Sequence, residues 1–97
     1  MFKFRVYRHG REVLLAACDE ELVGREFRDG KLRLKVTEAF YGTERIEPKD
    51  LLMQMRACTI ANLVGERVIT LAVEQGYIAD SNVLWIAGVP HAQMATY

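Results

Sequence analysis

The stretch that decides the fold runs from residue 59 to residue 76 and reads Thr-Ile-Ala-Asn-Leu-Val-Gly-Glu-Arg-Val-Ile-Thr-Leu-Ala-Val-Glu-Gln-Gly. On a helical wheel of about 100° per residue, its apolar side chains gather on one broad face. Both ends carry helix signals, because Thr59 can cap a first turn and Gly76 suits the left-handed conformation after a last turn. The stretch therefore predicts one long amphipathic helix whose apolar face covers the core.

The other side of this predicted helix is polar. Four polar residues recur at every fourth position, with Arg67 near their edge. They are Asn62, Glu66, Thr70 and Glu74. This ladder is either a solvated helix face or one wall of a polar site. Gly65 lies inside the predicted helix, where glycine costs about 0.5–1 kcal/mol relative to alanine, so another element is expected to pack closely against it.

Length and composition indicate one globular domain over residues 1–97, large enough for a single core. Hydrophobic residues make up 51% of the chain and charged residues 27%, which is typical of a folded protein. Thirteen basic residues balance thirteen acidic ones, which argues against a protein that coats nucleic acid by bulk charge. The first 36 residues nevertheless hold nine of the basic and six of the acidic residues, so a basic face is possible.

Apolar stretches are shorter than the roughly 18 residues needed to span a bilayer, and the N-terminus does not match a signal peptide. We therefore expect a soluble, cytoplasmic protein without a membrane partner. Cys18 and Cys58 lie in apolar surroundings and form no close pair, which predicts buried thiols. Together with His9 and His91 they match no compact ligand spacing, so no metal or other cofactor is expected.

Alternating patterns predict strands on both sides of the central stretch. Strands are expected over residues 2–7, 12–18, 31–36 and 83–87, and a second helix from residue 48 to about residue 56. Residues 39–43 fit either a strand end or an ordered loop. Three strands, two helices and one or two further strands predict an α+β fold. We expect a two-layer sandwich in which two helices pack on one face of a mainly antiparallel sheet.

Two of the predicted strands carry regularly spaced basic residues on one face. The residues are Lys3 and Arg5 beside Tyr7, and Lys31, Arg33 and Lys35. If these strands are neighbours, five cations and one aromatic ring share the sheet face opposite the helices, where they could hold an RNA backbone and stack a base. The alternative is an ordinary solvated sheet face, on which lysine and arginine are common.

A second group of candidate site residues combines the predicted helix with the C-terminal segment. Its members are Asn62, Glu66, Arg67, Pro90, His91 and Gln93. If the C-terminal segment returns to the helix, His91 beside the Glu66 carboxylate forms a possible general acid and base pair. The alternative is a structural histidine whose hydrogen bonds hold the C-terminal segment in place.

Several segments resemble an archaeal family known as domain of unknown function 424. They are Thr-Ile-Ala-Asn-Leu-Val-Gly-Glu-Arg at residues 59–67, Gly-Val-Pro-His-Ala-Gln at 88–93, Cys-Asp-Glu-Glu-Leu-Val-Gly at 18–24 and Phe-Tyr-Gly at 40–42. The resemblance covers nearly the whole chain. It implies a small α/β domain of the archaeal cytoplasm, and genes of similar proteins suggest an association with translation and RNA processing. Since the family has no established activity, the resemblance carries none over to this chain.

Three functions follow as hypotheses. The first is a non-enzymatic binding module that contacts RNA or the translation machinery through the basic strands. The second is a small-molecule enzyme or ligand-binding protein with its polar site at Asn62, Glu66 and His91. The third is a protein-interaction subunit, for example a homodimer that forms through an exposed strand edge.

Overall fold

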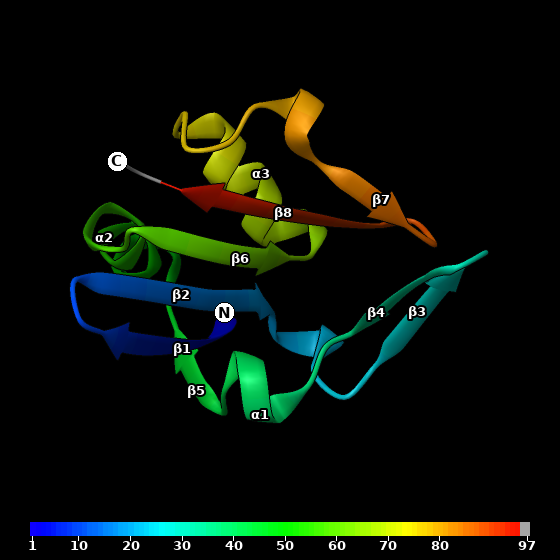
Figure 1. The fold of residues 1–97 in the computed structure, drawn as a ribbon, viewed down its shortest axis with the longest axis horizontal. Coiled ribbons are helices and arrows are strands. Elements are labelled where there is room, and N and C mark those ends of the chain that lie inside the picture. The colour runs from blue at the N-terminus through cyan, green and yellow to red at the C-terminus, as the bar shows by residue number, and fades with distance from the viewer. Residues whose placement is uncertain (96–97) are drawn as a thin grey trace.

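A six-stranded sheet forms the centre of the molecule (Figure 1). The structure is a computed structural model that describes residues 1–95. The strands lie in the order β5-β1-β2-β6-β8-β7, and all neighbours are antiparallel except β2 and β6, which are parallel. Their bounds are β1 Phe2–His9, β2 Glu12–Asp19, β5 Glu44–Ile46, β6 Ile60–Val64, β7 Leu84–Ile86 and β8 Val89–Ala95. The predicted α+β fold with a mainly antiparallel sheet is confirmed.

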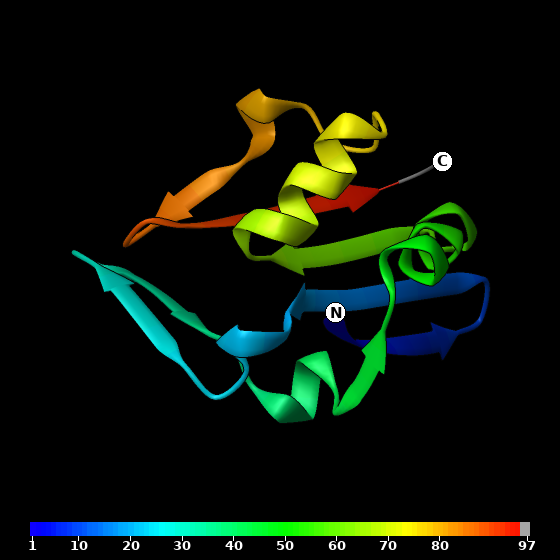
Figure 2. The same ribbon diagram turned by 180° about the vertical axis from the view of Figure 1, so that it is seen from behind.

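Two helices cover one face of this sheet, as predicted (Figure 2). They are α2 (Pro48–Ala57) and α3 (Glu66–Glu74). Leu51 and Met55 of α2 and Val68 of α3 are fully buried against side chains that alternate along the strands, such as Leu15 and Leu63. Burial of these apolar side chains is the main stabilising contribution to the two-layer arrangement.

The prediction of one helix from residue 59 to residue 76 is wrong. Residues 60–64 form β6, and the helix begins only at Glu66. Between them Gly65 has φ 121° and ψ 150°, a conformation that interrupts any helix. Strand β6 lies between β2 and β8 and is largely buried on both faces, so it lacks the alternation that identifies a half-exposed strand. The predicted Thr59 cap is also wrong, because the Thr59 hydroxyl accepts a hydrogen bond from the Val13 amide (2.9 Å).

Asp19 joins the end of β2 to the start of α3. Its carboxylate accepts hydrogen bonds from the backbone N–H groups of Arg67 (3.0 Å) and Val68 (2.9 Å), which have no partner inside the helix. Gly65 lies directly against this carboxylate, and a Cβ at that position would be 2.4 Å from Asp19 Cγ. The close packing expected at Gly65 is therefore present, and the group that packs there is a buried carboxylate.

The second face of the sheet is partly covered, by two segments that the two-layer prediction did not include. One is the short helix α1 (Glu38–Tyr41), which forms in the region left undecided between strand and loop. The other is a hairpin of β3 (Glu26–Asp29) and β4 (Leu32–Lys35), which makes a separate two-stranded sheet and extends to the same end of the molecule as β7, which it contacts (Figure 1). A second apolar cluster joins these segments to the sheet through Val36, Tyr41 and Ile86.

The remaining short elements are two 3-10 turns, η1 (Glu20–Leu22) and η2 (Asp80–Asn82). Cys18 and Cys58 are buried thiols, as predicted, and burial raises the pKa of Cys18 to about 12. Within residues 1–95, no helix has the length and apolar character that a transmembrane span requires.

Candidate functional site

The basic residues of β1 face away from α2 and α3, as predicted, but they bind the backbone around α1. The Lys3 ammonium donates to the Thr43 carbonyl (2.8 Å), and the Arg5 guanidinium donates to the Ala39 carbonyl (2.9 Å). The Tyr7 hydroxyl also donates to Ala39, at 3.1 Å. These side chains hold the segment that covers the sheet, so they are not a free surface for a ligand.

The second basic group lies on the β3–β4 hairpin and not beside β1. Its residues are Lys31, Arg33 and Lys35. Because this hairpin is a separate sheet, the prediction of one continuous surface with Lys3, Arg5 and Tyr7 is wrong. Glu26 lies among the hairpin cations, 2.8 Å from Arg28, 3.4 Å from Arg33 and 3.9 Å from Lys35. The hairpin cations therefore form a basic group of their own, separate from that of β1.

Three residues of the second predicted group do lie together, on the sheet face opposite α2 and α3. Asn62 of β6 is directly opposite Gln93 of β8, and the His91 Nε2 atom is 3.1 Å from Asn62 Oδ1. The hydroxyl of Tyr41, from α1, donates to the same oxygen at 2.7 Å. Tyr41, Asn62 and His91 thus form a hydrogen-bonded cluster that connects α1, β6 and β8.

The other three residues lie on the helix-covered face. Pro90 precedes His91 in β8 and therefore points to the opposite side of the sheet, where it is buried. Glu66 and Arg67 begin α3 on that side, and Arg67 pairs with Glu21 (2.8 Å). The sheet separates Glu66 from His91, so the predicted carboxylate–imidazole pair does not form.

His91 is half-buried and neutral near pH 7, because burial lowers its pKa from the ordinary value of 6.5. With Asn62 Oδ1 as acceptor, the proton of the neutral ring lies on Nε2. Burial also raises the pKa of Tyr41, which therefore stays protonated and donates. None of the four pockets described on residues 1–95 is lined by Asn62 or His91. The two hydrogen bonds of the cluster, which connect α1, β6 and β8, favour the interpretation of His91 as a structural histidine.

The depressed pKa of His91 makes stability depend on pH. The unfolded chain binds this proton more readily than the folded protein, so the contribution of the neutral ring is complete above about pH 6.5 and is lost as pH falls through the lowered value. We expect the urea midpoint to fall between about pH 7.5 and pH 5.5 more in the parent protein than in His91→Gln. Equal pH dependence of the two proteins contradicts a buried neutral His91.

Comparisons with known proteins agree with this architecture. The family model described as "Protein of unknown function (DUF424)" matches residues 7–97, nearly the whole chain. The chain belongs to the DUF424 family. A solved structure, an uncharacterized conserved protein from Methanopyrus kandleri, is similar at 26% identity and a TM-score of 0.79, over 99% of this chain and 93% of that one. The search of curated proteins finds no match.

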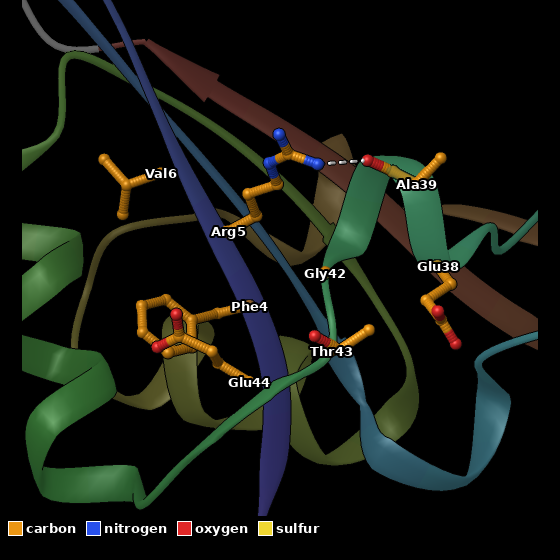
Figure 3. A pocket seen from close by; sticks show the side chains of 8 residues that line it. All are labelled: Phe4, Arg5, Val6, Glu38, Ala39, Gly42, Thr43 and Glu44. Atoms are coloured by element: carbon orange, nitrogen blue, oxygen red, sulfur yellow. Dashed lines mark hydrogen bonds between the residues drawn. The ribbon is translucent and has the colours of Figure 1, made fainter.

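A pocket of about 710 Å³ opens in this DUF424 chain where β1 extends beyond β5 (Figure 3). Arg5 reaches across it to Ala39, and Gly42 has φ 85° with a hypothetical Cβ only 2.3 Å from the Phe4 carbonyl oxygen. From Arg5 to His9 the outer edge of β1 has no strand partner among the described residues. The pocket is therefore the gap left beside β1 where β5 ends. The exposed arginines along this edge discourage another strand from pairing there.

Sequence reasoning missed Tyr41, which completes the Asn62 cluster. The sequence signal for Tyr41 was an aromatic pair followed by glycine at residues 40–42. In the structure the rings of Phe40 and Tyr41 pack edge to face with their centroids 4.9 Å apart, and Gly42 permits the turn that follows. The strand predicted over residues 83–87 was expected to be buried, which is wrong for Trp85: this residue of β7 is 54% exposed at the edge of the sheet.

Proposed function

We propose that this protein is a non-enzymatic module that binds RNA through the β3–β4 hairpin. The observation that carries the proposal is a separate two-stranded hairpin (Figure 1) whose basic residues are all exposed. Residues 25–35 hold five basic residues and two acidic ones, an excess of three positive charges in a chain with no net charge. The basic residues are Arg25, Arg28, Lys31, Arg33 and Lys35.

The hairpin suits a phosphate backbone in spacing as well as in charge. Alternate residues of a strand repeat about every 6.8 Å, comparable to the rise of two nucleotides at about 3.4 Å each. Arg28 and Arg33 are cross-strand partners, and their side chains are 68% and 50% exposed. Such contacts depend on backbone charge and shape more than on base sequence. The family resemblance extends this proposal to the archaeal cytoplasm and to the translation machinery.

The test is binding of a single-stranded RNA and of an RNA duplex, measured by fluorescence anisotropy over a range of salt concentrations. Affinity should fall as salt rises, because neutralised phosphates release their counterions. Arg28→Glu/Arg33→Glu should weaken binding at least about tenfold and reduce the salt slope by about two.

The matched control is Lys49→Glu/Arg56→Glu, which makes the same charge change on exposed residues of α2, away from the hairpin. It should retain most of the affinity. Absence of binding to both RNAs at low salt, or equal weakening by the control and the hairpin variant, overturns the proposal.

A further inference from the structure

A groove of about 340 Å³ lies between α3 and β7 on the helix-covered side of the sheet. Its apolar lining includes Ile69, Val73, Val83 and Trp85. Three acidic residues also line it: Glu66 and Glu74 of α3, and Asp80 of η2. The polar ladder that sequence analysis found on the central stretch therefore supplies one acidic wall of this groove.

This groove has the features of a binding surface that lacks its partner. Trp85 is the single tryptophan of the chain and is 54% exposed, although large aromatic side chains usually contribute to cores or interfaces. Within the part of the chain that the structure describes, Glu66, Glu74 and Asp80 form no ion pair. An apolar surface surrounded by three unpaired carboxylates fits an apolar side chain flanked by lysine or arginine.

The chain itself carries such a segment at the tip of the β3–β4 hairpin. Leu32 is 45% exposed, and its neighbours are Lys31 and Arg33. The hairpin has three excess positive charges, and the groove has three carboxylates, while the whole chain has no net charge. A neutral protein with separate patches of opposite charge is prone to associate with itself.

We infer that the groove between α3 and β7 binds the hairpin tip of a second copy of this chain, with Leu32 against Trp85. Figure 2 shows β7 and the hairpin tip at the same end of the molecule, and β3 and β4 contact β7. A two-fold arrangement can therefore form the same contact twice, from each hairpin to the other copy's groove. The result is a closed dimer stabilised by two equivalent charged and apolar contacts.

Dimer formation covers the cations that the proposed function assigns to RNA. If that function holds, RNA and the second copy compete for the hairpin, and added RNA should convert dimers to monomers. Self-association does not itself depend on RNA binding, because it follows from the groove and the hairpin tip alone.

The test uses light scattering for mass and the fluorescence of Trp85 for the contact. At about 0.1 M salt the mass should rise toward that of a dimer with increasing concentration, and the Trp85 emission should shift to the blue. At about 1 M salt the charged contacts are screened and the dimer should weaken. Glu74→Lys/Asp80→Lys and Lys31→Glu/Arg33→Glu should each be monomeric, because like charges then face each other across both contacts.

An equimolar mixture of these two variants provides the decisive measurement. In a mixed pair each basic hairpin meets an acidic groove and each acidic hairpin meets a basic groove, so the dimer should return. Its return also shows that both variants are folded. A parent protein that is monomeric at every concentration, or a mixture that stays monomeric, overturns the inference. The groove variant keeps an unaltered hairpin, so its RNA binding separates failure of this inference from failure of the proposed function.

Discussion

Gly65→Ala is expected to destabilise the protein by about 3–5 kcal/mol, a large part of the 5–15 kcal/mol typical of a small domain. Residues with a side chain rarely adopt φ 121° and ψ 150°. The new Cβ would also lie 2.4–2.7 Å from the carboxylate atoms of Asp19, which is 5% exposed and cannot move into solvent without leaving α3. Loss of an N-terminal cap alone costs about 0.5–2 kcal/mol. Urea denaturation measures the change.

Gly76→Ala is the matched control for this substitution. Gly76 has φ 79°, but no atom lies within 4 Å of its hypothetical Cβ. Alanine there should therefore lower the free energy of unfolding only by the cost of a left-handed backbone, about 1 kcal/mol. Asp19→Ala tests the mechanism further. Combined with Gly65→Ala, it should cost less than the sum of the two single changes, because removal of the carboxylate removes the clash. Additive losses, or similar losses at Gly65 and Gly76, contradict a specific contact between Gly65 and Asp19.

Asn62→Leu is expected to destabilise the protein by about 2–4 kcal/mol. The Asn62 side-chain oxygen accepts hydrogen bonds from the Tyr41 hydroxyl and from His91 Nε2. Leucine has a similar size but no acceptor, so both donors lose their hydrogen-bond partner. Tyr41 is 3% exposed, so its hydroxyl has little access to water, and an unsatisfied buried donor costs about 1–3 kcal/mol. Thermal and urea unfolding measure this loss without any assumption about a ligand.

Tyr41→Phe supplies the control. It removes the buried donor and leaves Asn62 bonded to His91, so it should cost only about 1 kcal/mol. The double variant Tyr41→Phe/Asn62→Leu should be more stable than Asn62→Leu, because one orphan donor disappears. If Asn62→Leu is as stable as the parent protein, the structural role assigned to the cluster is contradicted. That result favours the hypothesis that Asn62 and His91 bind a ligand.

Local pattern was a reliable guide where an element has one buried face. The alternation in residues 2–7 predicted β1, and Pro48 at the start of an amphipathic segment predicted α2. The same reasoning misassigned β6, because Ile60 to Val64 form a nearly continuous apolar run that also fits a helical wheel. The informative residue was Gly65, whose cost inside a helix is better explained by a junction between strand and helix.

The candidate surfaces depended on pairings between distant residues, which local pattern does not contain. Strand β4 has the composition of a sheet strand, but it pairs with β3 and leaves β1 to pair with β2 and β5. The residues of each basic group do share one strand face, as the alternation predicted, but α1 partly covers the face of β1, and the two groups lie on different sheets. The same limit applied to His91, since the alternation within β8 places it and Pro90 on opposite faces.

The parallel contact between β2 and β6 has a consequence for how the chain folds. Its register joins Leu14 to Ile60, so the two central strands meet only after a loop of more than forty residues closes. Loop closure of this length loses more entropy than a tight turn such as that between β1 and β2, and proteins rich in such distant contacts fold more slowly. During synthesis the β1–β2 hairpin can form early, whereas the two central strands of the sheet can pair only after β6 has left the ribosome.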